Sequence, residues 1–282
     1  MSPMGYGQRI AWLNKETNKR KKDKNIVLFD MDGTLTEARK TFDPCLFEPL
    51  KKLSDISEIG IVTGSDIDYL KEQLSSFIYE EKLKNSIHLL PCNGTKHYKF
   101  SEKNNEYELV FDVNMKEELG PDKFKSLMVC IIEQHSAGML YRFPLTGHFI
   151  QYRGSMINWC PIGRNAKDSE RNQFIEFDNS SSPTYRSSQL SLLNHKLSIH
   201  GVNVTVKFGG DTSFDIYPIG WDKTFCLRHF KYKDIWFVGD RCGINGNDKE
   251  IYDFLKSENR SFETENPENT KVIIENKILV QI

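Results

Sequence analysis

The amino-acid sequence predicts an α/β protein with a doubly wound parallel-sheet core and an inserted α+β domain that contains an antiparallel sheet. Two observations lead to this prediction. Toward both ends of the chain, short apolar runs that end at polar loops alternate with helical patterns, which is typical of a parallel sheet covered by helices. The middle of the chain instead holds short segments in which apolar and polar residues alternate, which is typical of antiparallel strands.

The core elements follow from runs of apolar residues and from helical periodicity. Four apolar runs lack alternation, and we therefore expect buried parallel strands there. These runs are Ile26–Phe29, Ile59–Val62, Ile87–Leu90 and Ile235–Val238. Helical patterns lie near Asp43–Leu53, Ser65–Phe77 and Trp221–Phe230.

The middle of the chain predicts strands joined by tight turns. The expected strands are Tyr107–Phe111, Gly147–Arg153, Ser155–Pro161, Val204–Phe208 and Ser213–Tyr217, with helices near Asp122–His135 and Ala166–Phe177. Glycine-containing turns at Arg153–Ser155 and Gly209–Asp211 favour antiparallel hairpins. The Ser-rich segment Asp178–Arg186, which holds Pro183, is expected to be an exposed loop.

These patterns divide the chain into three parts. Residues 1–24 are expected to form a basic N-terminal tail, and its run of lysines is interpreted as solvated. Residues 25–100 and 220–282 are expected to form the α/β core, and residues 101–219 the inserted domain. A chain of 282 residues is long enough for two such units with cores of their own.

Composition excludes several classes of function. The formal net charge is -1, so no global field favours nucleic acid or a membrane as a partner. The sequence has no apolar window near the roughly 20 residues of a membrane span and no signal-peptide pattern at its start. The six cysteines are widely spaced, and we expect free thiols and a cytoplasmic, reducing location.

The strongest chemical signal is the segment Asp30-Met31-Asp32-Gly33-Thr34, directly after the first strand. In an open α/β sheet, ligands bind beyond the carboxyl ends of the strands. The carboxylates of Asp30 and Asp32 lie two residues apart and would repel each other, and a hard cation such as Mg2+ resolves that conflict. Backbone N–H groups of the glycine loop can bind phosphate. An ordinary Asp-Gly turn is the alternative interpretation.

Two further strand ends complete the predicted site. Thr63 follows the second strand, where a hydroxyl can bind phosphate, while Ser65 is a candidate cap for the next helix. Asp240 follows the last strand and can complete a magnesium site; the acids just beyond it are interpreted as loop residues and helix caps. Lys223 can offset the charge of a phosphate among carboxylates.

The inserted domain offers residues suited to a phosphorylated sugar. Arg164 and Arg171 are seven residues apart, so they would share a face if both were helical. Guanidinium groups bind phosphate oxygens with two parallel hydrogen bonds. Ser213 and Asp215 alternate with apolar residues on one strand, where they can bind sugar hydroxyls.

The four core segments in this order resemble the haloacid dehalogenase-like superfamily of aspartate-nucleophile phosphotransferases. The resemblance implies that Asp30 is the nucleophile and Asp32 the general acid/base. It also implies that Thr63 and Lys223 hold the phosphoryl group, with Asp30, Asp32 and Asp240 around Mg2+.

From about Asn25 to beyond Ile251, the chain is similar to the eukaryotic-type phosphomannomutases. The segments that carry this similarity are Thr36–Arg39, Phe149–Arg153, Asn158–Arg164, Glu170-Arg171, Gly209–Asp215 and Gly220–Lys223. The family interconverts mannose 6-phosphate and mannose 1-phosphate for GDP-mannose synthesis. The resemblance implies a sugar-phosphate substrate, a hexose 1,6-bisphosphate activator and a homodimer formed through the inserted (cap) domain. It assigns substrate binding to Arg39, Arg153, Arg164, Arg171, Ser213 and Asp215.

Two departures from the family pattern keep alternatives open. Cys92 stands where the family usually has a glutamate before Asn93-Gly94, and the carboxylate of the second ion loop near Glu250 is displaced. The alternatives are a sugar-phosphate phosphatase on the same fold, in which water accepts the phosphoryl group, and a catalytically silent binding protein.

Overall fold

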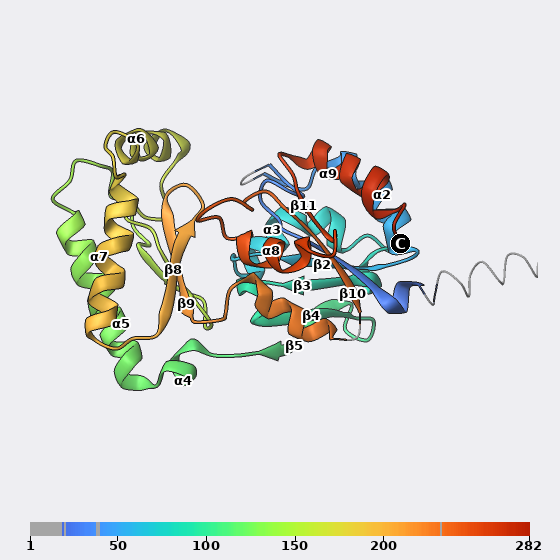
Figure 1. Ribbon diagram of the computed structural model, residues 1–282, viewed down its shortest axis with the longest axis horizontal. Helices are drawn as coiled ribbons and strands as arrows, with labels where there is room; N and C mark the ends of the chain where they lie inside the picture. The colour runs from blue at the N-terminus through green and yellow to red at the C-terminus, as the bar shows by residue number, and fades with distance from the viewer. Residues whose placement is uncertain (1–18, 20, 38–39, 232) are drawn as a thin grey trace, which may run out of the picture. The chain divides into compact units, whose positions relative to one another are not determined.

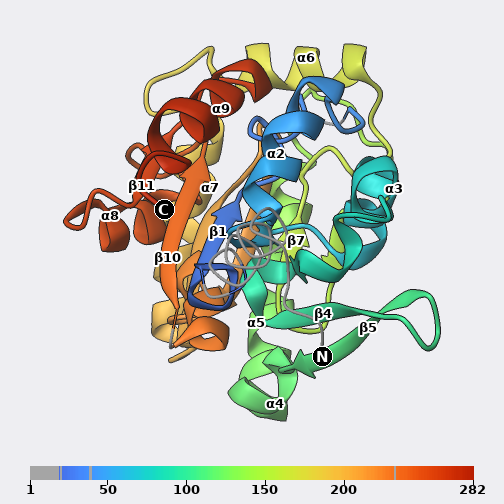
Figure 2. The same cartoon turned by 90° about the vertical axis from the view of Figure 1, so that its right-hand side faces the viewer.

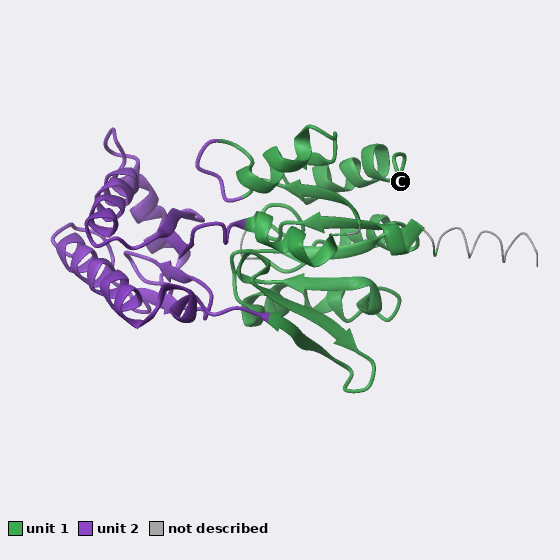
Figure 3. Cartoon of the chain, turned by 60° about the horizontal axis from the view of Figure 1, so that its bottom comes forward, with its two compact units in different colours: residues 1–111, 223–243, 248–282 green, residues 112–222, 244–247 purple. Residues whose placement is uncertain are grey.

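The computed structural model describes residues 19, 21–37, 40–231 and 233–282. The chain forms two compact units (Figure 3). Unit 1 comprises residues 1–111, 223–243 and 248–282, and unit 2 comprises residues 112–222 and 244–247. Unit 2 is therefore inserted into unit 1.

Unit 1 is built on a seven-stranded sheet in the order β11-β10-β1-β2-β3-β4-β5 (Figure 1). The first five strands in this order pair in parallel, and β4 pairs antiparallel to β3. The strands are β1 (Asn25–Phe29), β2 (Glu58–Val62), β3 (Ile87–Leu90), β4 (Lys96–Ser101), β5 (Glu106–Asp112), β10 (Asp234–Gly239) and β11 (Ser261–Glu263). All four predicted core strands are thus confirmed, as is the parallel sheet.

Helices cover both faces of this sheet because successive side chains of a strand point to opposite sides. Val27 and Phe29 of β1 join the core beneath α2, α3 and α9, whereas Ile26 and Leu28 join the core beneath η4 and α8. All four side chains are fully buried. The helices are α2 (Phe47–Ser54), α3 (Ile67–Ile78), α8 (Lys249–Lys256), α9 (Pro267–Ile273) and the 3-10 helix η4 (Lys223–Phe230). Short helical segments η1 (Pro44–Leu46), η2 (Lys84–Ser86), η3 (Cys92–Gly94) and η5 (Ile274–Ile278) complete the unit.

The strand order reverses at β1, which lies between β10 and β2. Figure 2 shows β1 beside β10. From β1 the chain proceeds to β2 and β3 on one side, while β10 and β11 lie on the other. Ligands of doubly wound proteins bind at such a reversal, beyond the carboxyl ends of the strands. Asp30, Thr63 and Asp240 follow the three strands that meet here.

Unit 2 contains a four-stranded antiparallel sheet in the order β6-β7-β9-β8. The hairpins β6–β7 and β8–β9 turn at Gly154 and Gly210, which have φ values of 87° and 61° that favour glycine. The strands are β6 (Ile150–Tyr152), β7 (Ile157–Trp159), β8 (Val204–Gly209) and β9 (Ser213–Pro218). The helices are α4 (Met115–Leu119), α5 (Pro121–Gly138), α6 (Asp168–Asp178) and α7 (Tyr185–Ile199).

Three local expectations differ from the structure. The predicted strand Tyr107–Phe111 is β5, which extends the core sheet and does not lie in the inserted domain, so unit 1 continues to residue 111. The segment Asp178–Arg186 is only partly a loop: Asp178 is buried and its carboxylate accepts hydrogen bonds from the backbone and Nε of Arg186. Arg164 lies in a turn before α6, so the shared helical face with Arg171 does not form.

Candidate active site

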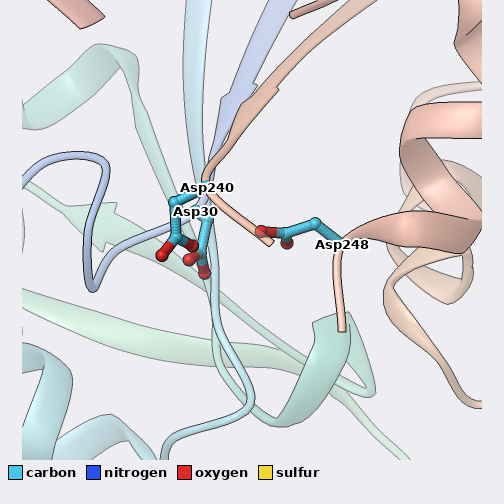
Figure 4. Close-up of side chains that lie close together, drawn as sticks. All are labelled: Asp30, Asp240 and Asp248. Carbon is cyan, nitrogen blue, oxygen red and sulfur yellow. The ribbon is translucent and has the colours of Figure 1, made fainter. Parts of the chain in front are cut away.

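Three carboxylates meet at the carboxyl ends of β10 and β1. Ligand oxygens of Asp30, Asp240 and Asp248 all lie within 4.8 Å of one another. Figure 4 shows the carboxylates of Asp30 and Asp240 together, with that of Asp248 pointing toward them from the other side. Asp30 and Asp248 are buried and Asp240 is half-buried. Among the described residues, this is the group of acids that could hold a metal ion.

Lys223 lies among these acids. Its Nζ donates to Oδ1 of Asp30 and to Oδ1 of Asp248, at 2.5 Å in each case, and its side chain is fully buried. Burial lowers the pKa of Lys223, but the two carboxylates outweigh it and hold the pKa above its usual range, so the lysine stays charged. One ammonium group therefore faces three carboxylates.

The acids are short of positive charge. Burial, followed by the charge of Asp248, raises the pKa of Asp30 well above its usual range, although Lys223 opposes this. Burial and Asp248 also raise the pKa of Asp240 to about 6. In addition, Oδ1 of Asp240 is buried without a hydrogen-bond partner among the described residues. Arg241 Nε lies 3.7 Å from Oδ2 of Asp240 and lowers the pKa of Asp240, but burial and Asp248 outweigh it. A buried carboxylate oxygen without a donor, in a group of three acids, suits a hard divalent cation.

Two glycines make room for this group of acids. A Cβ atom at Gly33 would lie 2.3 Å from Oδ2 of Asp240, and the φ value of 84° also favours glycine. A Cβ atom at Gly239 would lie 2.6 Å from Oδ2 of Asp248. The acids can thus lie this close to the strand ends only because both positions are glycine.

The group of acids contains one member that was not predicted as a metal ligand, Asp248. The predicted contributor Asp32 is not part of this group, and its Oδ1 accepts a hydrogen bond from the hydroxyl of Tyr69 at 3.1 Å. Asp248 reaches the site because the loop after β10 closes on itself: its N–H donates to the carbonyl of Arg241, and the N–H of Arg241 donates to its Oδ2. The sequence signal for it is the segment Asn247-Asp248, which follows Gly239-Asp240 in the superfamily resemblance.

Thr63 lies at the end of β2, beside this group in strand order. Its side chain is buried, and Oγ1 accepts the N–H of Ser65 at 3.1 Å, which leaves the hydroxyl hydrogen for another acceptor. The following helix is capped by Asp66 and not by Ser65, because the carboxylate of Asp66 accepts the N–H of Tyr69. Arg39, which was predicted to bind the substrate, lies outside the described residues.

The predicted sugar-binding residues of unit 2 lie together on its sheet. Asn158 and Asp215 are cross-strand neighbours, and Nδ2 of Asn158 donates to Oδ1 of Asp215 at 2.7 Å and to Oγ of Ser213 at 3.0 Å. Oδ1 of Asn158 accepts from Arg164 at 3.0 Å. Nη1 of Arg153 lies 4.0 Å from Asp215. Sequence analysis did not single out Asn158 as a site residue, although it hydrogen-bonds three that were predicted.

Arg171 joins the same region through another residue that was not predicted. Its Nη1 donates to the hydroxyl of Thr212 at 2.7 Å, and its Nε donates to the carbonyl of Ala166 at 3.2 Å. Thr212 directly precedes Ser213 in β9. Unit 2 therefore presents guanidinium, hydroxyl and carboxylate groups held by a network of hydrogen bonds, an arrangement suited to a phosphorylated sugar.

Comparisons with known proteins agree with this arrangement. The sequence profile of the eukaryotic phosphomannomutase family matches residues 46–280. Phosphomannomutase 1 of Dictyostelium discoideum is 36% identical over 250 residues, which cover 87% of this chain and 93% of that protein. The phosphomannomutase of Saccharomyces cerevisiae is 34% identical over 258 residues, covering 90% and 94% of the two chains.

Solved structures support the fold class. Plasmodium falciparum IMP-nucleotidase bound to IMP has a TM-score of 0.61 at 14% identity, covering 100% of this chain and 75% of that one. A haloacid dehalogenase-like hydrolase from Bacteroides thetaiotaomicron has a TM-score of 0.51 at 13% identity, covering 89% and 98%.

The chain has a haloacid dehalogenase-like fold, with a second unit inserted into the α/β core. Within that class, the chain belongs to the eukaryotic phosphomannomutase family and is an enzyme of the phosphomannomutase type. The profile match begins after the Asp30 loop, so the roles of Asp30 and Asp32 depend on the geometry at the ends of the strands.

Proposed function

We propose that this enzyme interconverts mannose 6-phosphate and mannose 1-phosphate through a phosphoryl group carried on Asp30. The observation that supports this best is the convergence of Asp30, Asp240 and Asp248 around Lys223 in a chain related to phosphomannomutases. Mannose 1-phosphate formed in this way would supply GDP-mannose synthesis.

The reaction divides into two phosphoryl transfers. In the first transfer, a carboxylate oxygen of Asp30 attacks one phosphorus of a hexose 1,6-bisphosphate and the bond from that phosphorus to the sugar oxygen breaks, while Asp32 gives a proton to the oxygen. In the second transfer, Asp32 removes a proton from the free hydroxyl of a mannose monophosphate; this oxygen attacks phosphorus, releases Asp30 and forms the bisphosphate again. A hexose 1,6-bisphosphate would supply the first phosphoryl group to Asp30.

The donor set fits Mg2+ because it consists of carboxylate oxygens, one of them buried without a partner. When bound, Mg2+ would neutralise charge on the transferring phosphoryl oxygens. Asp30, Asp240 and Asp248 would hold the ion, and Asp32 stays a predicted contributor. Lys223 and Thr63 would bind phosphoryl oxygens at the same strand ends.

Unit 2 would bind the phosphate and hydroxyls that are not reacting. Arg153, Arg164 and Arg171 offer forked donors for the distal phosphate. Ser213 and Asp215 can bind sugar hydroxyls. Arg39 is proposed as a further ligand from the family resemblance alone. Because the sugar can react at two positions, these residues must accept the substrate in either orientation.

We also propose that two copies pair through unit 2 and that the enzyme works in the cytoplasm without nucleic-acid or membrane partners. All six cysteines are free thiols, which suits a reducing compartment. Within the described part of the chain, no helix combines the length and apolar character needed to cross a membrane.

The direct test supplies purified protein with mannose 1-phosphate, Mg2+ and a trace of hexose 1,6-bisphosphate. Formation of mannose 6-phosphate is expected, with no activity in Asp30→Asn. Asp32→Asn is expected to retain phosphorylation of Asp30 but to turn over very slowly. Release of free phosphate without isomerisation would instead indicate a phosphatase. Failure of the bisphosphate to label wild-type protein with Mg2+ present would indicate a silent binding protein.

A further inference from the structure

Tyr69 places its hydroxyl against the predicted proton-transfer residue. The phenol oxygen donates to Oδ1 of Asp32 at 3.1 Å, across 37 residues of sequence but within unit 1. Sequence analysis assigned no role to Tyr69. The contact is separate from the acid group of Asp30, Asp240 and Asp248.

The helix that carries Tyr69 holds it in a defined place. Tyr69 lies in the first turn of α3, where Asp66 caps the helix by accepting the N–H of Tyr69 at 3.0 Å. Leu70 and Leu74 of the same helix are fully buried in the core of unit 1. A side chain at the capped end of a packed helix has little freedom to move away from its partner.

The backbone around Asp32 is also held. Asp32 forms a β-bridge with Thr36, and the N–H of Gly33 donates to the carbonyl of Thr36 at 2.7 Å. Thr36 in turn donates its N–H to the carbonyl of Met31 at 3.1 Å. The main chain is thus fixed on both sides of Asp32, while its carboxylate can still rotate about the side-chain bonds. A hydrogen bond from Tyr69 limits that rotation.

We propose that Tyr69 is a positioning residue that holds the carboxylate of Asp32 for proton transfer, an inference that rests on the proposed mutase function. The phenol donates to Oδ1, and the proton is exchanged with the sugar oxygen at Oδ2. Because a carboxyl group can accept at Oδ1 whether or not Oδ2 carries a proton, the contact persists through both transfers. A general acid/base acts only within hydrogen-bond reach of its substrate atom, so its orientation governs turnover.

The same helix provides a matched control. Tyr79 directly follows α3, and its hydroxyl also donates to a carboxylate, that of Glu106, at 2.5 Å. Glu106 begins β5 and has no place in the proposed reaction. Tyr69→Phe and Tyr79→Phe therefore remove the same chemical group from the same kind of bond, and only the first contacts Asp32.

The kinetic test compares wild-type enzyme with these two variants. Tyr69→Phe is expected to lower kcat about tenfold, the loss typical of a hydrogen bond to a charged group, with an unchanged KM. Tyr79→Phe is expected to keep the wild-type kcat. In an Asp32→Ala background, Tyr69→Phe should lower the residual turnover no further. The proposal would be overturned if the two phenylalanine variants had equal kcat values. It would also be overturned if Tyr69→Phe lowered turnover by the same factor in the wild-type and Asp32→Ala backgrounds.

A second measurement separates this inference from the proposed function. Urea unfolding midpoints are compared for Tyr69→Phe, Asp32→Ala and the double variant. If the hydroxyl contacts Asp32 in solution, the two midpoint shifts do not add. Additive shifts would overturn the inference even in a fully active mutase. If the wild-type enzyme only releases phosphate, the proposed function fails, and the kcat comparison for Tyr69 is made on that release.

Discussion

At the scale of single residues, the chemistry of the site depends on an unequal balance of charge. Three carboxylates share one buried ammonium group, and the pKa of Asp240 is raised to about 6 by burial and by Asp248. Removing either partner from a buried pair costs several kcal/mol, because the other charge stays behind without compensation. A divalent ion can relieve this imbalance without disturbing Lys223.

The first prediction concerns metal binding, measured without catalysis. Mg2+ is expected to raise the free energy of unfolding of the wild-type protein, by about 2.7 kcal/mol at a concentration a hundredfold above Kd. Asp240→Asn should lose most of this gain because the amide is a weaker ligand. Asp253→Asn, on the exposed side of α8, provides the control and should keep it. An equal gain in both variants would place the ion elsewhere.

The second prediction concerns Arg164. Its Nη1 donates to Asn158, which holds the side chain beside Ser213 and Asp215, and a guanidinium group can bind phosphate oxygens through two parallel hydrogen bonds. Arg164→Lys is expected to raise KM severalfold with a smaller effect on kcat, because a point charge replaces a fork. Steady-state kinetics with mannose 1-phosphate measures both. An unchanged KM would mean that Arg164 does not contact the phosphate.

Site residues could be predicted from the sequence where they directly follow a buried strand. Asp30, Thr63 and Asp240 each follow a buried apolar run, so their shared location could be read from the order of the strands. Asp248 could not be found in this way. It reaches the site only because the loop that begins at Asp240 closes through two hydrogen bonds between Asp248 and Arg241.

At the scale of secondary-structure elements, η4 connects Lys223 at its start with a group of buried imidazoles near its end. His229 on η4 lies against His97 of β4 with ring centroids 4.7 Å apart, and Nε2 of His97 lies 2.8 Å from Nδ1 of His88 on β3. His229 also contacts the carbonyl of Gly94 at 2.7 Å. These contacts join η4 to the loop after β3, whose Asn93 N–H donates to the carbonyl of Thr63 at 2.8 Å.

The third prediction is a loss of stability in acid. Burial, together with the neighbouring imidazoles of His88 and His229, lowers the pKa of His97 to about 3. An unfolded histidine has a pKa near 6.5, so between these values only the unfolded chain binds the proton. Stability is therefore complete above pH 6.5 and falls as the pH falls below it. At pH 5, His97 alone should cost about 2 kcal/mol.

Urea unfolding at pH 7.5 and pH 5.0 measures this effect. His97→Gln is expected to reduce the difference between the two pH values, although Lys99, Lys233 and Glu58 also face this group. His200, exposed at the end of α7, provides the control, and His200→Gln should leave the difference unchanged. A wild-type protein equally stable at both pH values would contradict the prediction.

Helices and strands could be predicted from the sequence where the spacing of apolar residues fits only one kind of element. The buried parallel strands could be predicted because an apolar run of four or five residues between polar loops is too short for a typical helix. The alternation in Tyr107–Phe111 correctly indicated a strand but not its sheet, since β5 on the edge of the core sheet and the strands of unit 2 share the same pattern. Contacts between residues far apart in the sequence decide which of the two sheets this strand joins.

At the scale of the whole molecule, unit 2 exposes apolar side chains on α5. Leu127, Cys130 and Ile131 of this helix are buried, while Val129 and Ile132 are 44% and 53% exposed. The two exposed residues are three positions apart, so they lie on one face of the helix. An apolar strip on an otherwise amphipathic helix suits the proposed pairing of two copies through unit 2.

The last prediction tests this pairing. Ile132→Glu places a charge in this strip, and burying an unpaired carboxylate in an interface between copies is costly. The variant is expected to sediment as a monomer at concentrations at which the wild-type protein sediments as a dimer. Phe254→Glu is the matched control, because Phe254 is also an exposed apolar residue, 66% exposed, but belongs to α8 of unit 1. Dissociation by Phe254→Glu and not by Ile132→Glu would move the interface to unit 1. If the wild-type protein sediments as a monomer at every concentration, the proposed dimer does not form.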